Sequence, residues 1–134
     1  MQQLNKSLKR KLNAESMLAH EEELRRALVP LAEAFDRWRK GELDSGSLAL
    51  QIHDWDLGPQ KALFKKYNYG IKEMNVAWAI VTGILDERKV DPELLQTLER
   101  HIAFYRQQLR EELETPASDA ANHGQSSGAR THGD

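Results

Sequence analysis

The chain has 134 residues, a length typical of one domain, and 40% of them are hydrophobic while 30% are charged. The formal net charge of −2 gives no overall positive field that would favour nucleic acid or an anionic membrane, and the absence of cysteine excludes disulfides and thiolate chemistry. The first residues are polar and basic, and the longest apolar stretch, residues 76–85, is too short to span a bilayer. We therefore expect a cytoplasmic protein with no membrane span.

Residues 1–14 form a basic segment that is either an arm or the start of a helix. Leucines recur there every four residues, which places them along one side of a helix. Four cations occur in six residues, with no acid before Glu15: Lys6, Lys9, Arg10 and Lys11. Such a segment can contact nucleic acid, an anionic surface or an acidic partner, and its ordinary alternative is a solvated helix start.

Residues 15–40 carry the clearest helical pattern of the chain. Apolar residues recur there at alternating spacings of four and three, which is an a/d seam of about three heptads. The members of this predicted seam are Leu24, Leu28, Leu31, Phe35 and Trp38. Because Pro30 lies inside the segment, we expect either a kinked helix or a break near Val29. Gly41, which follows a basic last turn, is expected to end the helix.

Two short helices are expected next, over residues 47–56 and 59–67. Asp44 and the serines after it offer N-cap oxygens for the first. The sequence Leu57-Gly58-Pro59 is expected to break the chain, and Pro59 suits the first turn of the second helix because its missing N–H would be unpaired there anyway.

Two longer helices follow, over residues 71–89 and 92–114. The first is apolar on nearly all sides, so it should lie at the centre of the bundle. Asp91-Pro92 is a strong start signal for the second, with a capping carboxylate followed by proline at the first helical position. From Thr115 onward the apolar content falls, and we expect residues 115–134 to be disordered.

The sequence therefore predicts an all-α bundle of about five helices over residues 15–114. A long first helix, two short helices and two longer antiparallel helices make up this bundle, and no β alternation occurs. The three tryptophans, Trp38, Trp55 and Trp78, are expected to be largely buried, with their indole N–H groups bonded.

The residues His53, Asp54 and Asp56 are the nearest approach to a catalytic or metal-binding set. On a helix they point in divergent directions, so they do not converge on one ion or one reacting atom. Neither a phosphate-binding glycine loop nor a nucleophile elbow occurs in the sequence. We expect a protein that is not an enzyme and takes no cofactor or metal.

A second basic group, Lys61, Lys65 and Lys66, is interleaved with aromatic residues. Cations beside aromatic rings can hold phosphates and stack bases, which makes nucleic acid a possible partner through this group and the basic N-terminal segment. The ordinary alternative is that the aromatic residues belong to the core while the lysines face solvent. A helix-turn-helix interpretation fits poorly, because a turn at Gly58 would leave Asp54 where close helix packing needs a small residue, and Pro59 follows immediately.

The predicted seam leads to the favoured hypothesis. A helix over residues 13–40 would be about 42 Å long, whereas each of the two short helices would be about 15 Å. Part of the seam would then lack an intramolecular cover and would be available to a second chain. We therefore predict a non-catalytic helical interaction or regulatory module that binds a protein partner or itself.

Overall fold

The computed structural model describes residues 4–114 and confirms the predicted all-α bundle. Six α-helices occur, joined by one π-helical and one 3-10 segment, and no strand is found between residues 4 and 114. In chain order the elements are α1 (Lys6–Arg39), α2 (Ser45–Trp55), the π-helix η1 (Asp56–Gln60), α3 (Lys61–Tyr69), α4 (Lys72–Val81), the 3-10 helix η2 (Glu87–Lys89), α5 (Pro92–Thr97) and α6 (Glu99–Glu114). The predicted disordered tail, residues 115–134, lies outside the described residues.

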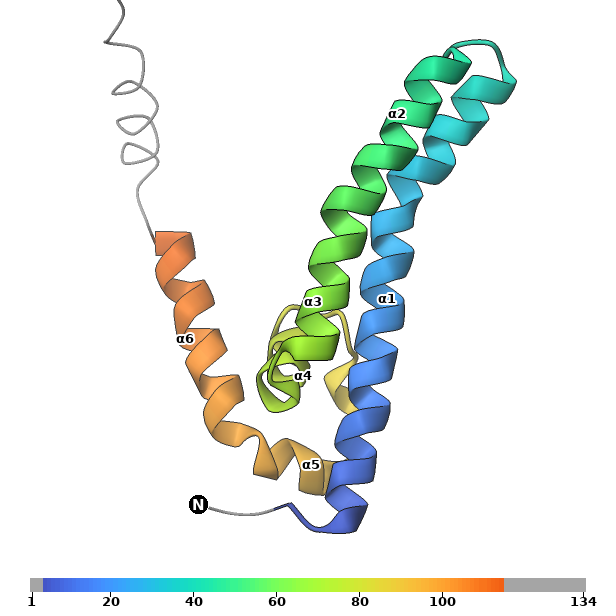
Figure 1. Cartoon of the computed structure of the whole chain (residues 1–134). Helices are drawn as coiled ribbons and strands as arrows, with labels where there is room; N and C mark the ends of the chain where they lie inside the picture. The colour runs from blue at the N-terminus through green and yellow to red at the C-terminus, as the bar shows by residue number, and fades with distance from the viewer. Residues whose placement is uncertain (1–3, 115–134) are drawn as a thin grey trace, which may run out of the picture.

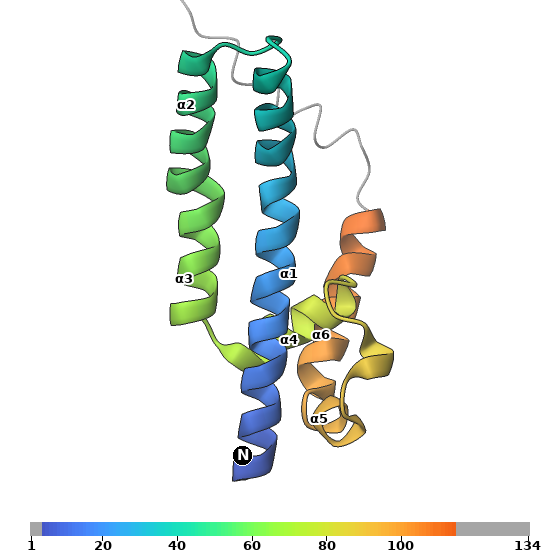
Figure 2. The same cartoon turned by 90° about the vertical axis from the view of Figure 1, so that its right-hand side faces the viewer.

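A long helical hairpin and a smaller helical base make up the molecule (Figure 1). Helix α1 runs the length of one side, and α2, η1 and α3 return antiparallel to it. Helices α4, α5 and α6 form the base against the N-terminal half of α1, with α4 packed on both α1 and α6. Figures 1 and 2 show that the upper part of the hairpin stands clear of the base, so only two helices pack together there.

Helix α1 begins inside the basic N-terminal segment. The side chain of Asn5 caps it by accepting a hydrogen bond from the Leu8 N–H at 2.8 Å. Leu8 and Leu12 are buried in the core of the base, so residues 6–14 are the first turns of α1. The helix continues unbroken through Pro30, and the alternative of a break near Val29 is wrong. Gly41 ends the turn after α1 with a φ of 78°, a backbone conformation that glycine adopts without strain.

The predicted break at Leu57-Gly58-Pro59 is wrong, because α2 runs into α3 through the π-helical segment η1. A proline inside an α-helix clashes with the carbonyl four residues earlier. The wider π turn relieves that clash. Residues 45–69 therefore form one continuous rod that is long enough to lie along most of α1.

Helix α4 lies at the centre of the base, as its apolar sequence predicts. Val76, Ala77 and Ala79 are fully buried and Ile80 nearly so. The predicted extent of this helix, residues 71–89, is wrong at its C-terminal end, because α4 stops at Val81. The chain turns away at Gly83, where φ is 81°, and returns only as the short 3-10 helix η2.

The predicted helix over residues 92–114 is divided into α5 and α6. Leu98 lies at the junction with a φ of −92° and a ψ of 6°, outside the α-helical range. Both Leu94 and Leu98 are fully buried, and Ile102 nearly so. The bend therefore lets α5 pack on α1 while α6 packs on α4.

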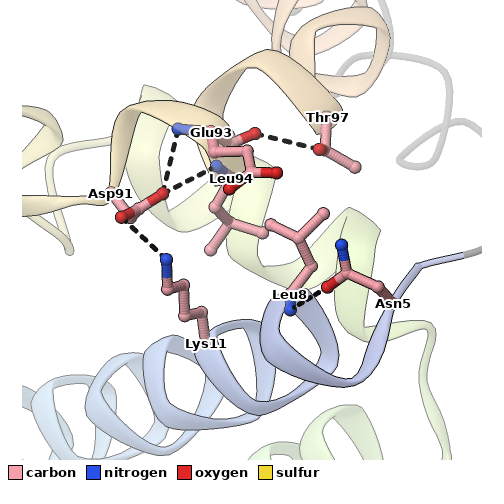
Figure 3. A network of polar contacts seen from close by, with 7 residues as sticks. All are labelled: Asn5, Leu8, Lys11, Asp91, Glu93, Leu94 and Thr97. Carbon is pink, nitrogen blue, oxygen red and sulfur yellow. Dashed lines mark hydrogen bonds and ion pairs between the residues drawn. The ribbon is translucent and has the colours of Figure 1, made fainter.

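The start of α5 is bonded to the N-terminal part of α1 (Figure 3). The Asp91 carboxylate accepts hydrogen bonds from the N–H groups of Glu93 and Leu94, which confirms the predicted start at Asp91-Pro92. Its other oxygen accepts a hydrogen bond from Lys11 Nζ at 3.0 Å. The hydrogen bond from Lys11 is the main cause that holds the pKa of Asp91 below its ordinary value of 3.8.

Asp91→Asn is expected to destabilise the protein at neutral pH and to have a smaller effect in acid. Because the folded pKa of Asp91 lies below its unfolded value, the charge contributes stability above pH 3.8, which is lost as the pH falls through the folded pKa. Urea unfolding of both proteins at pH 7 and near pH 3 measures this difference. Asp54→Asn, which changes an exposed carboxylate, is the matched control, and an equal Asp91→Asn effect at both pH values would contradict the assignment.

Candidate interaction surface

The predicted seam lies on the hairpin, and none of its members is fully covered. Leu24, Leu31 and Phe35 are half-buried, whereas Leu28 and Trp38 are 43% and 40% exposed. Beyond Ala19 the only buried residue of α1 is Ala34, and α2 buries only Leu48. The described hairpin therefore closes over a thin apolar layer and leaves large apolar side chains in contact with solvent.

The tryptophans show the same incomplete cover. The expectation that all three are largely buried is wrong, because Trp38 is exposed while Trp55 and Trp78 are half-buried. Two of their indole N–H groups still find acceptors within the hairpin: Trp38 donates to Ser45 Oγ at 3.0 Å, and Trp55 donates to the carbonyl of Ala27 at 2.8 Å. These bonds hold α2 against α1, but a pair of helices has no third layer that could cover the rings.

A shallow, mainly apolar groove follows the junction of α1 with α2 and η1. Its lining residues are Pro30, Leu31, Gln51, Asp54, Trp55 and Pro59. The two prolines present no N–H donor, and the indole N–H of Trp55 is already bonded to α1. This groove therefore offers apolar contact rather than a set of reactive groups.

A polar cluster fastens α3 to α1 within the hairpin, and one of its members also contacts the base. Lys66 Nζ donates to the Glu23 carboxylate at 2.8 Å, and the Tyr67 hydroxyl donates to the same oxygen. Lys66 also lies over the Trp78 ring of α4, 3.8 Å from its centroid, and the His20 ring stacks on the Tyr67 ring. Burial, together with the Glu23 carboxylate, raises the pKa of Tyr67, so its hydroxyl stays a donor at neutral pH.

Sequence reasoning missed this cluster because its members are distant in sequence. Glu23 is separated from Lys66 and Tyr67 by 43 and 44 residues, so no local spacing indicates the contact. The aromatic residues next to Lys66 were the available signal. Their sequence pattern allows either nucleic-acid contacts or core positions, and the core interpretation is correct for Tyr67, which is buried.

The seven cations predicted to contact a polyanion do not form one surface. Lys11 is bonded to Asp91 and Lys66 to Glu23, so both are already neutralised within the chain. The other five are exposed, and they are Lys6, Lys9, Arg10, Lys61 and Lys65. Residues 66 and 67 lie beside residues 20 and 23 of α1, so the α3 cations are about 15 Å or more along α1 from its first turns.

The histidine and aspartates considered for chemistry are exposed and do not converge, and Asp54 is among the residues that line the apolar groove. His53, Asp54 and Asp56 are all exposed at the end of α2 and the start of η1. Within residues 4–114, no group of three or more histidine or carboxylate side chains is placed to hold a metal ion. A second surface hollow, beside α5 and α6, contains the exposed ion pair of Arg106 with Glu87, at 2.7 Å.

In comparisons with known proteins, no protein-family model, curated protein or solved structure matches this chain. In the part of the chain that the structure describes, none of the helices combines the length and the apolar character that crossing a membrane requires.

Proposed function

We propose that this protein is a non-catalytic helical interaction module that associates with itself through the hairpin. The observation that supports the proposal most strongly is the incomplete cover of α1 and α2. Four large apolar residues of α1 and α2 outside the predicted seam are at least half exposed, in addition to Leu28 and Trp38 of the seam. They are Met17 at 73%, Leu18 at 56%, Val29 at 50% and Leu50 at 59%.

A second chain is the simplest way to cover such a surface. Single exposed apolar residues are common on proteins, whereas several on one projecting element are typical of an interaction site. Two-helix hairpins gain stable cores when they pair into bundles of four helices, because each helix then has neighbours on two sides. The proposal includes the predicted seam as part of the contact surface and a cytoplasmic location.

The nucleic-acid alternative has weaker support. Five of its seven predicted cations are exposed, but they lie in two separate groups, and the net charge of the chain is −2. Binding to phosphates is strongest where many cations lie on one face. We therefore propose protein contact rather than nucleic-acid contact as the main function.

Leu28→Asp tests the proposal, because it places a charge in the exposed apolar surface of α1. Since Leu28 is 43% exposed, the variant is expected to keep its helical circular dichroism and to lose self-association. Size-exclusion chromatography with light scattering at micromolar concentration measures the mass. Leu113→Asp makes the same change at an 87% exposed residue of α6 and is expected to leave association unchanged.

If Leu28→Asp unfolds the chain, the residue belongs to the core and the proposal loses its main support. If the variant folds and associates as well as the unchanged protein, the hairpin is not the contact surface. Loss of association with retained folding, together with a normal Leu113→Asp control, is the result that the proposal requires.

A further inference from the structure

One face of α1 is open to solvent for five helical turns, and we call it the free face. Its members lie within about 120° of the helix surface, at the spacing of 3.6 residues per turn. They are Ala14, Met17, Leu18, Glu21, Arg25, Leu28, Val29 and Ala32, and every one of them is exposed. The face is therefore an apolar stripe with two small residues at its ends and one acid and one base at its middle.

The rest of the molecule leaves this side of α1 accessible. In Figure 1, α1 forms one margin of the protein along its whole length, with the other helices to one side of it. Figure 2 shows α1 between α2 and α3 on one side and the base on the other. Because α1 lies at the margin of the protein and every residue of the free face is exposed, this face is accessible to another molecule.

The free face is symmetric about residue 23 in a way that matches a two-fold axis. Ala14 and Ala32 lie nine residues from that centre, and Met17 and Val29 lie six residues from it. Leu18 and Leu28 each lie five residues from the centre, and Glu21 and Arg25 each lie two residues from it. When two identical helices pair antiparallel about an axis at residue 23, each residue lies opposite its counterpart in the second copy.

In that pairing every apolar residue meets an apolar residue, and every charge meets the opposite charge. Glu21 of one copy lies against Arg25 of the other, and the second pair follows by symmetry. Neither side chain makes an ion pair elsewhere in the described structure, although they are four residues apart on one helix. Beyond the ends of the free face, Arg10 and Asp36 are a further oppositely charged pair, each thirteen residues from the centre.

We infer that the free face of α1 is the contact surface of an antiparallel, two-fold symmetric homodimer. This inference rests on the proposed self-association and adds its geometry. The charges select the direction, because a parallel pairing in register would place Glu21 against Glu21 and Arg25 against Arg25. The alanines at both ends let the two helices approach closely, at the usual 8–10 Å between packed helix axes.

Charge reversal tests the inference with surface variants that should fold normally. Glu21→Arg leaves two bases on the face, and Arg25→Glu leaves two acids. The dimer dissociation constant of each variant alone is therefore expected to rise about tenfold or more. Mixing the two variants puts opposite charges together at both contacts and should restore dimerisation as a heterodimer. The double variant Glu21→Arg with Arg25→Glu should likewise restore the homodimer. Sedimentation velocity measures all four cases.

Cross-linking tests the direction, because the chain has no cysteine of its own. A mixture of Ala14→Cys and Ala32→Cys is expected to form an intermolecular disulfide. Either variant alone should not, since the two equivalent positions would then be about 27 Å apart. A disulfide in the Ala14→Cys protein alone would show a parallel pairing and would overturn the inference.

The outcomes separate this inference from the proposal on which it rests. If the unchanged protein dimerises and the charge reversals have no effect, the contact surface lies elsewhere and only the inference fails. If the unchanged protein is monomeric at every concentration, both the inference and the proposed self-association fail. Three results together support the inference: weaker dimerisation of each single charge-reversal variant, recovery of dimerisation when the two are mixed, and the cross-link between positions 14 and 32.

Discussion

Leu98→Ala is expected to lower the free energy of unfolding by about 2–5 kcal/mol, the usual cost of removing a buried leucine side chain. Leu98 is fully buried at the junction of α5 and α6, where its side chain belongs to the core that includes Leu94 and Val76. Truncation leaves a cavity that this bend cannot close without moving α5 or α6. Urea unfolding followed by circular dichroism, at one fixed protein concentration, measures the change.

Leu113→Ala provides the control for Leu98→Ala, since it makes the same substitution where the leucine is 87% exposed. Its effect is expected to stay within about 0.5 kcal/mol. Equal effects of the two substitutions would contradict the placement of the core around α4, α5 and the first turns of α1.

Glu23→Ala is expected to cost about 1–3 kcal/mol of unfolding free energy, because it leaves Lys66 and the Tyr67 hydroxyl without their shared acceptor. The Glu23 side chain is only 15% exposed and that of Lys66 is 27% exposed, so water replaces the carboxylate poorly. Chemical denaturation measures the loss. A double-mutant cycle with Tyr67→Phe measures the coupling of the two groups directly.

Glu22→Ala is the neighbouring control. Glu22 pairs with Arg26 four residues along the same helix, on the surface, and such pairs contribute only about 0.3–0.5 kcal/mol. If removal of Glu23 costs no more than removal of Glu22, the cluster does not fasten α3 to α1.

Local sequence signals predicted the helix ends that depend on local chemistry. The predicted helix start at Asp91-Pro92 and the predicted helix end at Gly41 are correct, because a capping carboxylate and a left-handed glycine act within one turn. The continuity of the chain through Leu57-Gly58-Pro59, the end of α4 at Val81 and the bend at Leu98 are not indicated by local signals and depend on packing. A π turn retains Pro59 inside a rod, whereas the burial of Leu98 bends a segment whose periodicity alone favours one helix.

The candidate site could be predicted only in part for the same reason. The four-three spacing identified the seam on α1, but spacing does not say which side α2 covers. The structure places α2 and α3 along one side of α1 and leaves the free face open to solvent. The free face and the seam have Leu28 in common. A search for large apolar residues overlooks the alanines and the charges of this face, although its symmetry is present in the sequence.

Sedimentation equilibrium of the unchanged protein, over a concentration series through the micromolar range, tests the central claim of self-association most directly. The free face contributes eight residues from each chain, fewer than the roughly 20–30 of a standard interface, so association should be reversible and concentration-dependent. The predicted result is a weight-average mass that rises from the 15.4 kDa of one chain toward twice that value. A mass that stays at 15.4 kDa at every concentration would contradict it.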